Sequence, residues 1–95
     1  MNDHDFLTPE VLIAEAQIGQ EAEDWLNSQI GQYIVGCANQ DIRDAMDQLK
    51  RADPDDSKMI RDLQLKISSR ELAVRWIMEI IDRGNDAFQQ LNTEQ

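Results

Sequence analysis

The sequence predicts an all-α fold: an antiparallel helical hairpin, preceded by a short extra helix, that self-associates into a four-helix bundle. Three observations predict it. Capping residues precede both prolines, the second half carries a heptad pattern, and the first half carries a continuous apolar stripe. With 95 residues the chain fits a single helical domain, 1–95.

The two prolines mark expected helix starts. Thr8 precedes Pro9, and Asp53 precedes Pro54. In each case a good N-cap residue is followed by proline at the first helical position. Because Pro54 disfavours helix at the residue before it, the turn falls at 52–53. So short a turn makes two long helices antiparallel neighbours, which we expect at 20–51 and 54–90.

The second half has a clear heptad seam. Positions spaced alternately by three and four carry large apolar side chains at eight of ten places, which is typical of a coiled-coil contact. The ten positions are Ile60, Leu63, Ile67, Arg70, Val74, Ile77, Ile81, Gly84, Phe88 and Leu91. Antiparallel pairing brings Arg70 close to Asp41, and a buried arginine must be paired. We therefore predict a buried Arg70–Asp41 ion pair.

The first half is less regular. Apolar residues recur there every four positions from Ile18 to Met46, and such a stripe winds around a helix by about 40° per step. One straight partner helix cannot cover it, so either the first half breaks at a glycine or it contacts more than one helix along its length. We expect a break at Gly19, with a short helix at 9–18. Gly31 and Gly36 would lie inside the long helix, at a cost of about 1 kcal/mol each relative to alanine. We interpret them as sites of close helix contact.

More apolar side chains are present than one seam can bury. A large exposed apolar patch usually marks an interface. We therefore expect a homo-oligomer, with a dimer favoured, although the first helix could instead fold back to make a three-helix monomer. The predicted interface residues are Trp25, Ile30, Tyr33, Leu65, Leu72, Trp76 and Ile80.

Charge is strongly uneven along the chain. The net charge is -10, and residues 1–42 hold eight acidic and no basic side chains. Such a surface repels phosphate backbones, so direct nucleic-acid binding is not expected. The longest charge-free run, residues 25–40, is too short and too polar to span a bilayer. The acidic N-terminus and the single cysteine favour the cytoplasm.

No constellation of catalytic or metal-binding residues is present. His4 is the only histidine and Cys37 the only cysteine, which is too few for a zinc site. On an apolar helix face Cys37 is expected to be a core residue. Carboxylates at Glu21, Glu23 and Asp24 suit the start of a helix. We therefore expect neither an enzyme nor a cofactor.

The stretches "LKRADPDDSKMIRDLQLKI" and "WIMEIIDRG" resemble short helical proteins encoded in tailed-phage and prophage genomes, often of unassigned function. The resemblance covers roughly 20–85. It implies a cytoplasmic bacterial setting and a role in phage assembly or in managing the host. We expect a structural or assembly role, in the cytoplasm or in a virion, with a phage structural component as partner. The alternative is an acidic mimic of nucleic acid that blocks a host DNA-binding protein.

Overall fold

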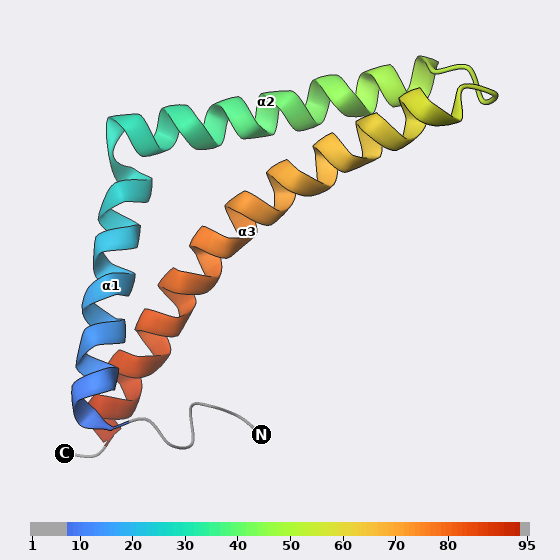
Figure 1. Cartoon of the computed structure of the whole chain (residues 1–95). Coiled ribbons are helices and arrows are strands. Elements are labelled where there is room, and N and C mark those ends of the chain that lie inside the picture. Colours follow the sequence, from blue (N-terminus) through green and yellow to red (C-terminus); the bar gives the residue numbers. More distant parts are fainter. Residues whose placement is uncertain (1–7, 94–95) are drawn as a thin grey trace.

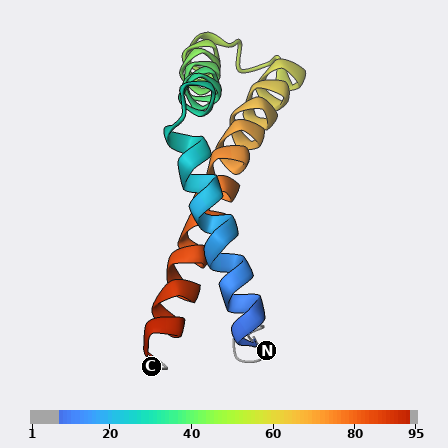
Figure 2. The ribbon, with the colours of Figure 1, turned by 90° about the vertical axis from the view of Figure 1, so that its left-hand side faces the viewer.

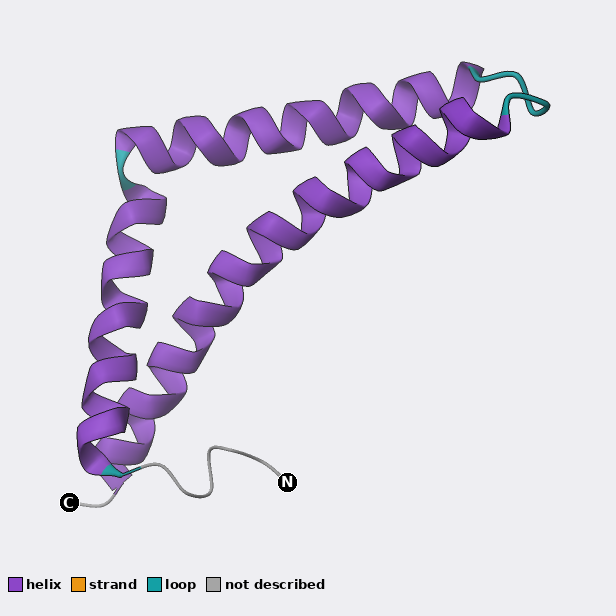
Figure 3. Ribbon diagram, in the orientation of Figure 1, coloured by secondary structure: helices purple, strands orange, loops and turns teal. Residues whose placement is uncertain are grey.

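The computed structural model describes residues 8–93, which form three helices joined by one corner and one turn (Figures 1 and 3). The helices are α1 (Pro9–Asn27), α2 (Gln29–Arg51) and α3 (Ser57–Thr93). Over the described residues the chain is all-α, as predicted. α3 is shared by two antiparallel pairs, because α2 lies along its first half and α1 along its second half.

The start of α1 agrees with the sequence. Pro9 is its first residue, and the Thr8 hydroxyl accepts a hydrogen bond from the Val11 N–H at 3.3 Å. This bond satisfies one of the backbone donors that a helix start leaves free.

The predicted break at Gly19 is wrong, because α1 runs straight through it. A Cβ built on Gly19 would lie 2.6 Å from the Cα of Gly84. The two backbones meet there, and Figure 2 shows α1 crossing α3. Gly19 therefore does not break the helix. Its missing side chain allows α1 and α3 to pack closely where they cross.

The break lies instead at Ser28, which has an extended backbone and forms the corner between α1 and α2 (Figure 1). The Ser28 hydroxyl accepts from the Gly31 N–H at 3.1 Å and so caps α2. Gly31 is buried against the backbone of Trp25, where a side chain would clash with the Trp25 carbonyl oxygen. The close contact predicted at Gly31 is therefore present, within the corner. Gly36 faces open space, and the contact predicted there is wrong.

The second turn is longer than predicted. Asp53 accepts a hydrogen bond from the Asp55 N–H at 2.9 Å, which holds Pro54 within the turn. Asp56 then caps α3 by accepting from the Met59 N–H at 3.1 Å. α3 therefore begins at Ser57 rather than at 54.

The heptad seam of α3 faces α1 and α2 as predicted from Ile60 to Gly84, where every seam position is buried or half-buried. We call these residues the inner seam. Beyond Gly84 the prediction is wrong at Phe88, which is 57% exposed while Ala87 is buried, whereas Leu91 is half-buried as predicted. Beyond the crossing at Gly84, the buried face of α3 is shifted around the helix axis, so that Ala87 rather than Phe88 is covered.

The contact face of α2 differs from the stripe predicted for the first half. Ile30, Ile34 and Met46 belong to that stripe and are exposed. The less exposed positions of α2 alternate in steps of four and three, which makes a second heptad seam against α3. Apart from Asp41, which pairs with Arg70, they are Gly31, Val35, Ala38, Ile42, Ala45 and Leu49.

The three helices form a single layer. The principal extents are 60 × 36 × 15 Å, and the smallest is little more than one helix diameter of about 10–12 Å. The radius of gyration is 18.4 Å, whereas a compact chain of this length would have about 12 Å. The predicted hairpin therefore consists of α2 and the first half of α3 only. The predicted short helix at 9–18 is instead the 19-residue α1, which packs along the second half of α3.

Candidate functional site

Many large apolar side chains of the described residues are exposed to solvent. Only five hydrophobic residues are buried, two of them alanines, and Leu12 is the one large side chain that is fully enclosed. Thirteen large hydrophobic residues are exposed. A soluble domain normally covers such surface with a second layer of structure. The candidate functional site is therefore a set of apolar surfaces.

The first surface follows α3 on the side away from α2. It comprises Leu65, Ser69, Leu72, Trp76 and Ile80, which recur in steps of four, three, four and four. We call these five residues the outer stripe. At 100° per residue, the outer stripe lies about 150° around α3 from the inner seam. Leu65, Leu72 and Trp76 are 62%, 60% and 63% exposed, and Ile80 is half-buried.

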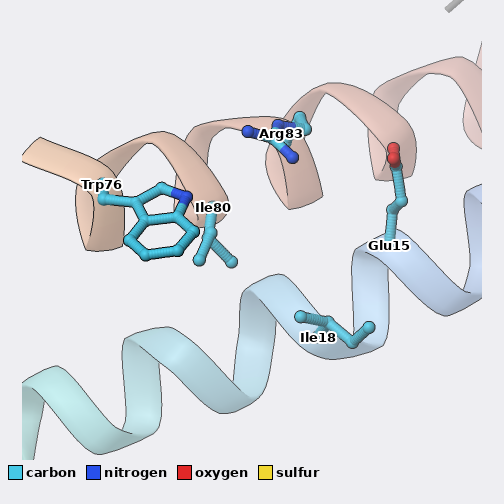
Figure 4. Close-up of a pocket in the computed structure, with 5 residues that line it drawn as sticks. All are labelled: Glu15, Ile18, Trp76, Ile80 and Arg83. Carbon is cyan, nitrogen blue, oxygen red and sulfur yellow. The ribbon is translucent and has the colours of Figure 1, made fainter.

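A hollow of about 310 Å³ lies beside the outer stripe, between α1 and α3. It is lined by Glu15, Ile18, Trp76, Ile80 and Arg83 (Figure 4). In Figure 4 the Trp76 indole and Ile80 lie next to each other on α3, with Ile18 on the facing helix. One carboxylate oxygen of Glu15, Oε2, is buried here without a hydrogen-bond partner. Buried carboxylate oxygens normally have one.

The second surface lies at the start of α2, next to the corner. It comprises Ile30, Tyr33, Ile34 and Cys37, all of them exposed, and we call it the corner patch. A hollow of about 580 Å³ opens beside Ile30 and Tyr33. The exposure of Cys37 contradicts its expected place in the core.

The predicted interface residues thus divide between two surfaces. Leu65, Leu72, Trp76 and Ile80 share the outer stripe. Ile30 and Tyr33 belong to the corner patch, and Trp25 is half-buried at the end of α1. Ile18 was missed, although its spacing of seven residues from Trp25 could have placed both on one line of α1.

The predicted ion pair forms. Arg70 Nε lies 3.1 Å from Asp41 Oδ2 and donates to it, which ties α3 to α2. The two side chains are 41% and 42% exposed, so the pair is half-exposed rather than buried as predicted. At that exposure an ion pair contributes about 0–1 kcal/mol to stability.

Charge is divided among the helices. α1 carries five acidic and no basic side chains, whereas α2 carries three of each. On α1, Glu10, Glu21 and Asp24 are exposed, and Glu15 and Glu23 are half-buried. Within residues 8–93, the excess of acidic side chains therefore lies on α1 and in the second turn.

Within residues 8–93, no group of three His, Cys, Asp or Glu side chains is placed to hold a metal ion. His4 lies outside the described residues. In the same part of the chain, no helix is both long enough and apolar enough to cross a bilayer.

No protein-family model matches this chain, and neither the curated proteins nor the solved structures contain a significant match to it.

Proposed function

We propose that this chain is a non-enzymatic helical interaction protein with a structural or assembly role, acting through the outer stripe and the corner patch. One observation carries the proposal: a single layer of helices that leaves thirteen large hydrophobic residues exposed. Apolar surface of this extent is normally covered by a partner.

The position of the two surfaces supports an assembly role. The outer stripe lies along α3, whereas the corner patch lies on α2 beside Ser28, where α1 and α2 meet (Figure 1). A protein with two separate apolar surfaces is able to contact two partners at once. The chain would then join another protein, of the kind found in phage particles, to further copies of itself.

The setting follows the resemblance to short tailed-phage and prophage proteins. In that setting the protein acts in the cytoplasm of a bacterial host and is incorporated in a virion or an assembly intermediate. Its net charge of -10 repels the phosphate backbone of nucleic acids, so its partners are proteins.

The test uses the corner patch in phage-producing cells. Tagged protein is purified with its bound virion or assembly components, and the Tyr33→Asp variant is compared with wild type. The matched control is Gln48→Asp, which adds the same charge at an exposed polar position of α2. We expect Tyr33→Asp alone to lose the component. Absence of any virion or assembly component from the wild-type preparation would contradict the proposal.

A second candidate rests on the acidic α1: an antagonist that imitates nucleic acid and occupies a host DNA-binding protein. Exposed Glu10, Glu21 and Asp24 motivate it. Replacing Glu21, Glu23 and Asp24 by lysine should abolish inhibition of DNA binding by the target. Unchanged inhibition by that variant would eliminate this candidate.

A further inference from the structure

The positions of the outer stripe are spaced almost symmetrically about its centre on α3. Leu72 lies at its centre, with Leu65 on one side and Trp76 and Ile80 on the other. If a second α3 runs antiparallel with the two-fold axis between positions 72 and 73, the two Leu72 side chains meet at the axis, and Leu65 of each copy lies level with Ile80 of the other. Ser69 then faces Trp76, and a small side chain leaves room for the indole.

Ionic residues continue this pattern at both ends. Asp62 precedes Leu65 by three residues, and Arg83 follows Ile80 by three. Both lie on the same line of α3 as the outer stripe, and both are exposed. In the antiparallel arrangement Asp62 of one copy faces Arg83 of the other, at both ends of the contact.

The charge along α3 favours the same direction. Residues 57–70 carry four basic side chains and one acidic, whereas residues 71–93 carry two basic and four acidic. The acidic α1 packs on the second half. Antiparallel helices place the basic half of each copy beside the acidic half and α1 of the other. Parallel helices would place like charges together, which costs free energy.

The hollow between α1 and α3 fits this arrangement as well. Leu65 of the second copy meets Ile80 at the edge of the hollow, next to Ile18. Lys58 of the second copy then lies level with Ala87. Ala87 is about one helical turn beyond Gly84, and the backbone carbonyl of Glu15 lies beside Gly84. Lys58 is exposed and forms an ion pair with Asp62 of its own helix at 3.2 Å. Glu15 Oε2 is buried, so the Lys58 of the second copy attracts the Glu15 carboxylate through space rather than by direct contact.

We propose that the outer stripe is a two-fold self-contact, in which the α3 helices of two copies pack antiparallel with Leu72 at the axis. The proposal rests on the proposed function as an interaction protein and specifies its first partner, a second copy of this chain. The contact is isologous: each copy contributes Asp62 and Lys58 to one end and Arg83 and Glu15 to the other. The corner patch stays free for a different protein.

A charge-swap experiment tests the pairing. Dimer dissociation constants are measured by sedimentation equilibrium for wild type, Asp62→Arg, Arg83→Asp and the double variant. Each single reversal places like charges at both ends and should raise the dissociation constant by about tenfold or more. The double variant restores opposite charges and should return to within about threefold of wild type. Asp44→Arg, on the exposed side of α2, is the control and should leave dimerisation unchanged.

Disulfide trapping tests the direction. In a Cys37→Ala background, Leu65→Cys and Ile80→Cys are prepared separately. Antiparallel packing separates the two copies of position 65 by roughly 20 Å along the axis, too far for a disulfide. Neither variant alone should form covalent dimers under mild oxidation, whereas a mixture of the two should. Efficient self-crosslinking of Leu65→Cys, or no crosslinking of the mixture, would overturn the proposal.

The two proposals fail separately. A wild-type protein that stays monomeric across the concentration series would overturn the self-contact. The purification with the Tyr33→Asp variant would still decide whether the chain is an interaction protein. Circular dichroism of each variant confirms that the helices are retained.

Discussion

Replacing Gly19 by alanine should destabilise the protein, although alanine is the better helix former. A Cβ at Gly19 would lie 2.6 Å from the Cα of Gly84, whereas ordinary contacts are 3.4–4 Å. α1 and α3 must therefore separate by about 1 Å at their crossing. Overpacking of this kind costs about 1–3 kcal/mol. The gain in helix propensity offsets about 1 kcal/mol of that cost, so the net loss is up to about 2 kcal/mol.

Gly36→Ala is the matched control. Gly36 is also inside a helix, but nothing lies within 4 Å of its would-be Cβ. Alanine there should stabilise the protein by about 1 kcal/mol. In a domain of this size, 1 kcal/mol shifts the Tm by about 4–8 °C. Thermal unfolding followed by circular dichroism therefore separates the two variants, provided the protein concentration is held constant. If Gly19→Ala raised the Tm as Gly36→Ala does, the crossing contact would be refuted.

Three further predictions concern the corner and the ion pair, and each is tested by urea unfolding. Gly31→Ala should cost more than about 2 kcal/mol, because its methyl group meets the Trp25 carbonyl; a neutral effect would contradict the corner geometry. Ser28→Ala removes the cap of α2 and should cost about 1 kcal/mol, whereas Ser28→Asp keeps a capping oxygen and should cost less. A double-mutant cycle on Asp41 and Arg70 should give a coupling below about 1 kcal/mol that weakens with salt. A coupling of several kcal/mol would mean that the pair is buried.

Local signals in the sequence predicted part of this structure well. The Thr8 cap depends on neighbours three residues away, and the inner seam depends on a single helical period, so both are visible in the sequence. The Asp41–Arg70 pair followed from the register of the turn. A register error of a full helical turn would have separated these two side chains.

Other features depend on tertiary contacts that carry no local signal. Glycine is poor in helices, so Gly19 resembled a break, yet its missing side chain serves the crossing with Gly84. Asp53 and Asp56 both precede good helix starts, and only the geometry of the turn selects Asp56. The outer stripe was recognised as surplus apolar residues. Its nearly symmetric spacing about Leu72 indicates a self-contact only because α1 and α2 leave that side of α3 free, and that arrangement is not visible in the sequence.

The sharing of α3 between two helix pairs has a consequence for the order of folding. α2 and the first half of α3 are joined by the five residues 52–56, whereas the contact of Gly19 with Gly84 encloses most of the chain. Closing a loop more than ten times as long costs about 2 kcal/mol more in chain entropy. The hairpin should therefore form first, and α1 should dock onto a helix that already exists. Amide hydrogens of α1 would then exchange with solvent through openings that leave α2 and its half of α3 protected.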